Sequence, residues 1–160
     1  MKQKVEIRPV RIDDLRDLFI MGKERLGDAP ADSARSWNEK NLAEIIADNL
    51  EISFVAVYKK TIVGCIIGAL DNCGMNAREA AIEWLCVRKS GDNDLAGGLL
   101  YAFQQCLREK NINKIRVNVP VSSAELIELY QKFGFTETEH VLTMENFLPK
   151  NIKPGTHPED

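Results

Sequence analysis

Two side chains in this sequence stand where they could transfer protons. Tyr130 lies near the end of a predicted helix that begins at Ser122-Ser123 and ends at Phe133-Gly134. Glu83 is the charged residue of a largely apolar run from Ala80 to Val87. A phenol can serve as a general acid, and a carboxylate can serve as a general base when burial raises its pKa. The alternatives are a tyrosine that packs at the helix end with its hydroxyl in water, and a carboxylate that faces solvent or pairs with Arg or Lys.

The elements that must position these side chains are predicted from apolar spacing and turn residues. Gly134 fits the left-handed position after a helix, which glycine adopts at low cost. Helices are predicted from Asp13-Asp14 to a break at Gly27–Pro30, from about Asn38 to Asn49, from Leu95 to about Lys110, and from Ser122-Ser123 to Phe133-Gly134. Strands are predicted at Val5–Val10, Ser53–Tyr58, Ile62–Leu70, Ala80–Val87, Lys114–Val119, Phe135–Thr138 and Val141–Phe147.

The order β-α-α-β-β-β-α-β-α-β-β predicts an α/β (α+β) domain. Its mixed central sheet would have about seven strands, with helices on both faces. Consecutive strands joined by short turns pair antiparallel, whereas the strand-helix-strand stretch from Ala80 to Val119 requires a right-handed parallel crossover. We expect one domain over residues 5–148. The tail Pro149–Asp160 has three prolines and few apolar residues, which predicts disorder.

Composition limits the classes of function. The 160 residues are 44% hydrophobic and 28% charged, with a net charge of −3, so neither nucleic acid nor an anionic membrane is an expected partner. No apolar run approaches the roughly 20 residues that span a bilayer. The N-terminus lacks the apolar core of a secretory signal, and we expect a cytoplasmic protein. Four cysteines form no Cys-x-x-Cys pair, and the two histidines lie far from them, so no metal is expected.

The segment from Ser122 to Phe135 is the most specific in the chain. It resembles the motif of GNAT acyltransferases usually written N-x-x-A-x-x-L-Y-x-K-x-G-F. The positions that match are Leu129, Tyr130, Lys132, Gly134 and Phe135, while Ser123 stands at the Asn and Leu126 at the Ala. The element order from Val5 to Leu148 and the opening Arg8-Pro9 and Asp13-Asp14-Leu15 also resemble that family.

This resemblance implies an N-acetyltransferase that uses acetyl-CoA as co-substrate and no metal. An amine would attack the thioester directly in a ternary complex. Tyr130 would then protonate the departing thiolate, which a phenol of pKa ~10 can do for a thiolate of pKa ~8.5 only when it is held close in a dry site. The base would be Glu83. The expected coenzyme contacts are Leu85, Cys86 and Val87 on the strand, Asn93, Asp94, Leu95, Ala96, Gly97 and Gly98 at the helix start, and Ser123 and Lys132.

The pyrophosphate loop departs from the family pattern, Q/R-x-x-G-x-G/A at a helix start. Free backbone amides and small residues there let phosphates approach. Counting back from the helix puts Gly91 at the Arg/Gln and Asp94 at the first glycine. Counting forward from the strand puts Asp92, Leu95 and Gly97 at the three positions. Neither alignment reproduces the pattern.

The acidic residues of this loop oppose phosphate binding. Asp94 is predicted to be the helix N-cap, whose carboxylate would take the amides that a phosphate needs. Asp92 adds a like charge. In compensation, Arg88, Lys89 and Lys132 could supply positive charge. The alternative is a capped helix that binds no ligand.

Three functions therefore remain open. The first is the acetyltransferase, with a small-molecule or peptide amine as acceptor and a homodimer as one arrangement of the chain. The second is a catalytically degenerate GNAT-fold binding or regulatory module that binds coenzyme A weakly or not at all. The third is a scaffold that pairs through an exposed strand edge. The sequence does not identify the acceptor amine.

Overall fold

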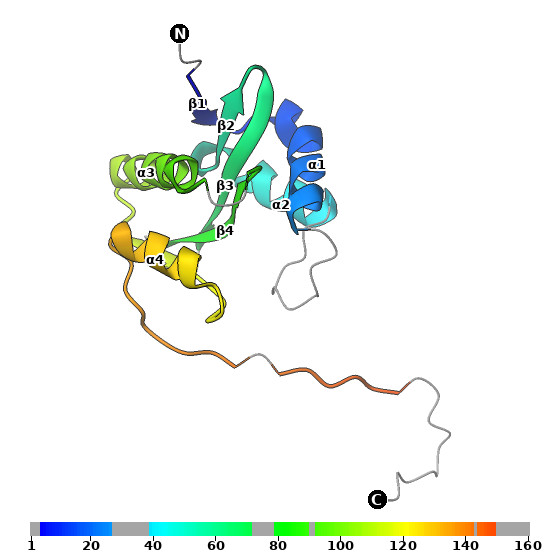
Figure 1. Ribbon diagram of the computed structural model, residues 1–160, viewed down its shortest axis with the longest axis vertical. Helices are drawn as coiled ribbons and strands as arrows, with labels where there is room; N and C mark the ends of the chain where they lie inside the picture. The colour runs from blue at the N-terminus through cyan, green and yellow to red at the C-terminus, as the bar shows by residue number, and fades with distance from the viewer. Residues whose placement is uncertain (1–3, 27–38, 72–78, 90–91, 143, 150–160) are drawn as a thin grey trace, which may run out of the picture.

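A computed structural model describes residues 4–26, 39–71, 79–89, 92–142 and 144–149 (Figure 1). Over these residues the strands are β1 (Glu6–Pro9), β2 (Phe54–Tyr58), β3 (Thr61–Asp71), β4 (Glu79–Val87) and β5 (Lys114–Val117). The α-helices are α1 (Leu15–Leu26), α2 (Glu39–Asn49), α3 (Asn93–Glu109) and α4 (Ala124–Lys132). Short 3-10 turns, Ile12–Asp14 and Leu50–Ile52, precede α1 and follow α2. The predicted break at Gly27–Pro30 and the predicted tail beyond Pro149 lie outside the described residues.

The strands form one sheet in the order β1-β2-β3-β4-β5. The first three pairs are antiparallel, and β4 and β5 are parallel, as the crossover through α3 predicted. A tight turn at Lys59 and Lys60 joins β2 to β3, and both residues have positive φ, of 48° and 63°. Two consecutive left-handed residues give the hairpin turn whose twist matches that of the flanking strands.

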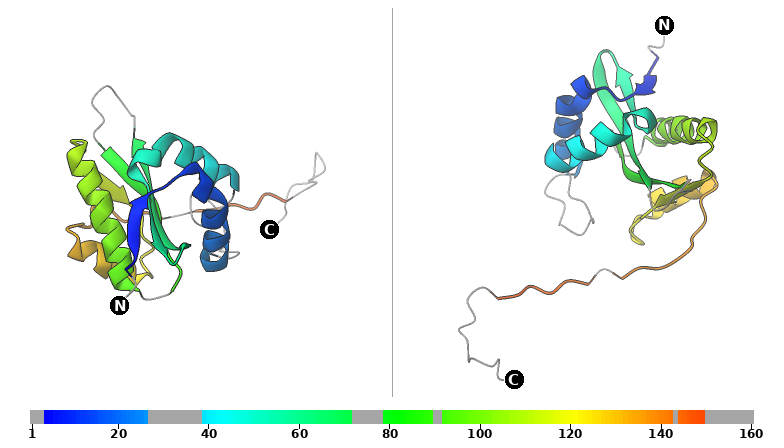
Figure 2. Two further views of the ribbon diagram at one scale, coloured as in Figure 1. Left: turned by 90° about the horizontal axis from the view of Figure 1, so that it is seen from above. Right: turned by 180° about the vertical axis from the view of Figure 1, so that it is seen from behind.

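Helices lie on both faces of the sheet (Figures 1 and 2), and an apolar cluster lies on each face. On one face, α1 and α2 present a helical stripe that includes Leu18, Met21 and Ile46, all 0% exposed. On the other face lie α3 and α4, and the ring of Phe103 is fully buried against the sheet. None of the helices in the described ranges is both long and apolar enough to cross a membrane.

The prediction of about seven strands is not met in the described part of the chain. Five strands are present, and neither Phe135–Thr138 nor Val141–Phe147 forms a strand where it is described. The segment after α4 instead runs away from the sheet in an extended path (Figures 1 and 2). Alternating apolar residues favour a strand, but a strand also needs a neighbouring edge to pair with, and sequence spacing does not supply that neighbour.

An ion pair fixes the start of the chain to its first helix. Arg8 donates two hydrogen bonds to the carboxylate of Asp14, at 2.7 and 2.8 Å, and the backbone N–H of Arg11 donates a third at 2.8 Å. These hydrogen bonds, that from Arg8 foremost, lower the pKa of Asp14. The Arg8 and Asp14 of the family-like opening therefore have a structural role here.

Two cysteines face each other across the centre of the sheet. Cys65 of β3 is the register partner of Cys86 of β4, and both side chains lie in the cluster under α1 and α2. Both are free thiols, and burial raises the pKa of each. Both cysteines belong to the hydrophobic core.

Candidate active site

The pairing between β4 and β5 ends halfway along β4. The register runs from Glu79 opposite Lys114 to Ile82 opposite Val117, where β5 stops, two residues short of its predicted end at Val119. The rest of β4, through Leu85 to Val87, extends beyond β5 toward the start of α3. The second half of β4 therefore has no β5 partner beside it.

A β-bulge in β4 lies at the point of separation. Ile67 of β3 pairs with Trp84, but the next residue, Gly68, pairs with Ile82, so Glu83 is the extra residue. The bulge shifts the alternation of β4: Ile82 packs in the α3 cluster, whereas Trp84 packs against the α1 and α2 cluster. Bulges bend a strand and re-aim its side chains, and they are common beside active sites. Glu83, the candidate base, is half-buried at this bend.

Beyond the bulge, alternate side chains of β4 face different clusters. Leu85 and Val87 are half-buried against the α3 cluster. Cys86 points the other way, into the α1 and α2 cluster, and is only 6% exposed. A ligand on the α3 side of β4 would therefore meet the side chains of Leu85 and Val87, and only the backbone of Cys86.

Tyr130 projects from α4 into the same α3 cluster and is 5% exposed. Its ring meets Phe135 edge to face, with centroids 5.2 Å apart. Burial raises the pKa of its phenol, which keeps the group protonated at neutral pH. No hydrogen bond of its hydroxyl is found among the described residues, and the described part of the chain has no buried side-chain oxygen or nitrogen without a partner.

Helix α3 begins earlier than predicted, and its N-cap is Asp92, not Asp94. The Asp92 carboxylate accepts a hydrogen bond from the backbone N–H of Leu95 at 3.1 Å, and its carbonyl accepts from Ala96 at 3.1 Å. The predicted capping role of Asp94 is therefore wrong, because the helix includes Asn93 and Asp94 as its first two residues. Asp94 stands exposed in the first turn.

The Asp92 cap leaves two backbone N–H groups at the start of α3 without an acceptor among the described residues. The first four N–H groups of a helix, counted from its N-cap residue, have no partner within it. That of Asp92 donates to the carbonyl of Lys89 at 3.3 Å. Asp92 takes that of Leu95, and among the described residues no acceptor pairs with those of Asn93 and Asp94. Backbone N–H groups at a helix start attract anions, but the two carboxylates beside them make this helix start less favourable to a phosphate than the family loop would be.

Three basic residues, Arg88, Lys89 and Lys132, were expected to supply positive charge near the start of α3, and two of them pair with acidic side chains. Arg88 pairs with Glu24 of α1 at 3.1 Å and donates to the carbonyl of Ile62 at 3.3 Å. Lys132 lies 3.8 Å from Glu128 on the exposed side of α4. Lys89 is exposed beside the loop. The positive charge of this region is therefore reduced by acidic partners at two of its three positions.

The small residues of α3 have a packing role. A Cβ atom on Gly97 would lie 3.2 Å from the ring of Phe133, and one on Gly98 would lie 3.1 Å from Ile7 of β1. Ala96 is buried in the core at 6% exposure. Small residues at these positions therefore let α3 approach α4 and the sheet closely. This packing accounts for the small residues without a bound phosphate.

The ends of α4 agree with prediction in part. Gly134 has φ +91°, the left-handed value predicted after the helix. Ser123 is the N-cap residue, but its side chain makes no capping hydrogen bond. The hydroxyl of Ser123 is therefore not committed to the helix, as a contact to a bound coenzyme would require.

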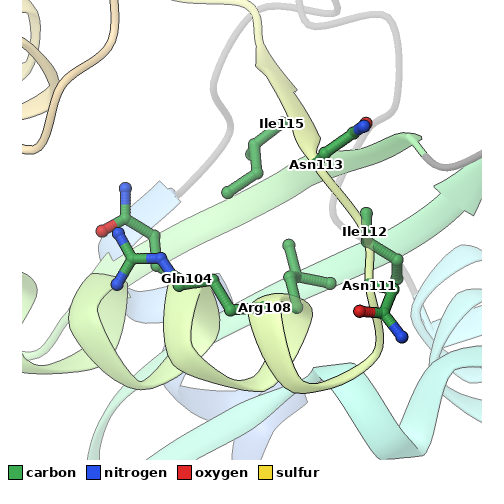
Figure 3. A pocket seen from close by; sticks show the side chains of 7 residues that line it. Gln104, Arg108, Asn111, Ile112, Asn113 and Ile115 are labelled. Carbon is green, nitrogen blue, oxygen red and sulfur yellow. The ribbon is translucent and has the colours of Figure 1, made fainter.

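A hollow of about 570 Å³ lies at the opposite end of α3 from these residues (Figure 3). No sequence signal indicated it, because it forms between the last turns of α3 and the start of β5. Its lining residues are Gln104, Leu107, Arg108, Asn111, Ile112, Asn113 and Ile115. It is remote from the start of α3, and none of the predicted site residues lines it.

The free end of β4 and the start of α3 thus lie near each other, on the side of the sheet where Tyr130 packs. A family model described as the acetyltransferase (GNAT) family matches residues 13–135. The chain therefore belongs to the GNAT acetyltransferase family, and its domain is that of an N-acetyltransferase. No curated protein matches the chain by sequence.

Solved structures share this fold at low sequence identity. The aminoglycoside N-acetyltransferase AAC(6')-Iy in complex with CoA is 20% identical with a TM-score of 0.71, covering 91% of this chain and 97% of its own. PaiA N-acetyltransferase from Thermoplasma acidophilum in complex with coenzyme A is 19% identical with a TM-score of 0.69, covering 86% and 93%. A ribosomal-protein-alanine N-acetyltransferase from Escherichia coli is 20% identical with a TM-score of 0.70, covering 85% and 80%.

Proposed function

We propose that this protein transfers an acetyl group from acetyl-CoA to a primary amine by direct attack in a ternary complex. The observation that carries the proposal is the end of β4–β5 pairing at Ile82 and Val117, directly before the bulge at Glu83. It leaves one half of β4 beside the start of α3, on the face where Tyr130 packs.

Acetyl-CoA would supply the activated acetyl group. The backbone of β4 from Leu85 to Val87 would hold its extended arm by strand-like hydrogen bonds. The amides of Asn93 and Asp94 would bind the pyrophosphate at the helix start. The open backbone amides fit this group, and the nearby carboxylates weaken the fit.

Proton transfer would be divided between Glu83 and Tyr130. The amine nitrogen bonds to the acetyl carbonyl carbon, and the carbon–sulfur bond breaks. Glu83, directly or through water, takes the proton that the amine loses, and Tyr130 gives a proton to the departing thiolate. The phenol of Tyr130 is protonated at neutral pH and can donate, while the pKa that burial raises makes it a weaker acid than a tyrosine in water.

Two classes of acceptor are consistent with the relatives of this fold. One neighbour is an aminoglycoside acetyltransferase and another acts on an alanine of a ribosomal protein. We therefore propose a small-molecule or peptide amine without choosing between them.

The first experiment measures the binding of acetyl-CoA. At 100 times its Kd the ligand should stabilise the domain by about 2.7 kcal/mol. For a domain of this length that free energy corresponds to a rise in Tm of roughly 5–10 °C. An unchanged Tm, with no heat of binding in calorimetry, would contradict the proposal and favour the degenerate binding module.

Tyr130→Phe tests the acid. The ring packing is retained, so Tm and the acetyl-CoA-induced rise in Tm should stay as in the wild type. Turnover should fall on the order of 10²–10⁴-fold with little change in KM for acetyl-CoA, since the lost interaction forms in the transition state. Glu83→Gln is the matching test of the base. Turnover that is unchanged in Tyr130→Phe would show that the thiolate takes its proton from water.

A further inference from the structure

Strand β2 supports only the first part of β3. The two strands pair as far as Phe54 opposite Ile66, and Phe54 is the first residue of β2. β3 continues through residues 67–71, which pair with the first half of β4. The bulge at Glu83 lies opposite the step from Ile67 to Gly68. The bulge therefore begins where the pairing with β2 ends.

Two side chains replace β2 along this edge of β3. The backbone N–H of Gly68 donates to Oγ of Ser53 at 3.2 Å, and that of Leu70 donates to Oδ1 of Asn49 at 3.0 Å. Backbone groups of alternate residues in a strand point to the same edge, so these two N–H groups continue the row that faces β2. Asn49 is the last residue of α2, which lies beside β3 (Figure 1).

The two hydrogen bonds differ in their access to water. Ser53 is 0% exposed, and its hydrogen bond with Gly68 is buried. Leu70 is 39% exposed, and its hydrogen bond with Asn49 lies at the surface. A buried N–H that loses its acceptor stays unpaired, whereas an exposed one can turn to water. Water can therefore replace Asn49 but not Ser53.

The face of the sheet constrains Gly68 as well. The fully buried ring of Phe103 lies directly over it, so closely that a Cβ atom at Gly68 would overlap the ring. The ring prevents Gly68 from moving toward α3, and Ser53 holds its N–H at the strand edge. The register partner of Gly68 is Ile82, the residue before Glu83. The contacts that fix Gly68 therefore fix the backbone that carries the Glu83 carboxylate.

The second half of β4 is supported differently. Leu85 and Val87 lie opposite Ile66 and Gly64 of β3, and both of these β3 residues pair with β2 on their other side. A continuous backbone ladder thus holds the part of β4 that would bind acetyl-CoA. The loss of the Ser53 hydroxyl should disturb the bulge and leave this second half in place.

We infer that Ser53 is a positioning residue for Glu83. Its buried hydroxyl holds Gly68, and through Gly68 the bulge, so that the Glu83 carboxylate keeps its place beside the attacking amine. Ser53 acts through the backbone of β3 and not by contact with the substrate. This inference rests on the function proposed above, in which Glu83 is the base.

The first test compares Ser53→Ala with Asn49→Ala, which removes the neighbouring acceptor on the same edge. Acetyl-CoA is the donor, and the acceptors are an aminoglycoside and a peptide with an N-terminal alanine. In Ser53→Ala, kcat should fall about tenfold to 100-fold, the effect of a misplaced reacting group. KM for acetyl-CoA should change less than about threefold, because the second half of β4 is held by β2. Asn49→Ala should lower Tm and leave kcat as in the wild type.

Ser53→Thr separates positioning from stability. Threonine keeps the hydroxyl but adds a methyl group at a fully buried position, so Tm should fall while kcat stays near the wild-type value. If Ser53→Ala does not fold, Ser53→Cys replaces it in each measurement, because it is similar in size and its sulfur is a weak acceptor. A kcat that follows Tm through all the variants would show that Ser53 only stabilises the fold.

The second test requires no turnover. Backbone NMR of the full-length chain compares amide exchange and chemical shifts in the same variants without ligand. In Ser53→Ala the Gly68 amide should exchange at least about tenfold faster, and shift changes should reach Glu83. In Asn49→Ala the changes should stay near Leu70. Equal changes at Glu83 in the two variants, or none in Ser53→Ala, would overturn the inference. A wild type that acetylates neither acceptor would contradict the proposed function, while the NMR comparison still decides whether Ser53 holds Glu83 in place.

Discussion

Replacing Asp94 with asparagine should strengthen the binding of CoA. The helix start of α3 holds two carboxylates, but only Asp92 has a structural task, through its hydrogen bond to Leu95 at 3.1 Å. Asp94 is exposed in the first turn and caps nothing. Its charge therefore acts on a bound pyrophosphate without a compensating contribution to the cap.

The size of the gain can be worked out from the helix geometry. A side chain on the second residue of a helix lies on the order of 7 Å from an anion on the first amides. At the dielectric constant of water this separation costs about 0.6 kcal/mol per charge, or about 1.2 kcal/mol for the roughly two charges of a pyrophosphate. Affinity should therefore rise about fivefold to tenfold at low salt. Screening over about 8 Å at physiological ionic strength should reduce the gain to about twofold to threefold.

The assay is calorimetric titration of CoA at two salt concentrations. Asp92→Asn is a second test of the same charge effect, because asparagine caps a helix as well as aspartate and only the charge is lost. It should show a similar gain in affinity. Asp92→Ala should lower the free energy of unfolding by about 1 kcal/mol, whereas Asp94→Asn should lower it only through the helix dipole, by about 0.3–1 kcal/mol. Unchanged affinity in both asparagine variants would refute the phosphate site at this helix start.

Two further predictions concern stability. Gly68→Ala should lower the free energy of unfolding, measured by denaturant titration, by about 1–3 kcal/mol. The new Cβ would lie 2.8 Å from Cζ of the buried Phe103 ring and closer still to Cε2. A variant as stable as wild type would show that the ring has room to move. The lowered pKa of Asp14 means that its pairing with Arg8 stabilises the fold above the ordinary carboxyl pKa of about 4, and that this stability is lost as pH falls through the lowered value. Asp14→Asn should therefore reduce stability at pH 7 and flatten its dependence on pH between 5 and 2, and equal slopes in the two proteins would contradict this.

The central elements were predictable because local patterns and tertiary contacts agree there. The helical stripe of α3 and the apolar run of β4 each indicate one structure, and both form. The helix that carries Tyr130 ends at Lys132, and the left-handed φ of Gly134 shortly after it was predicted from the residue type. The position of Tyr130 in the α3 cluster then follows from helical spacing.

Other features depend on contacts that spacing does not encode. Asp92 and Asp94 are equally good N-caps by type, and α3 starts at the earlier one, with Leu95 half-buried against the cluster. The bulge at Glu83 depends on the register of β4 against β3. The last two predicted strands are not formed in the described residues, although the outer edge of β5 is open, so alternation of apolar side chains alone did not predict pairing.

The neighbouring thiols of Cys65 and Cys86 can report how often the folded sheet opens. Their pKa values are raised by burial, so the thiolate form that reacts with alkylating reagents is scarce in the folded chain. Modification of either one must wait until the sheet opens. With alkylation followed by mass spectrometry, labelling at these two positions should be roughly 10³-fold or more slower than in the unfolded chain. The rate of alkylation at these two cysteines therefore measures how often the centre of the sheet is exposed to solvent.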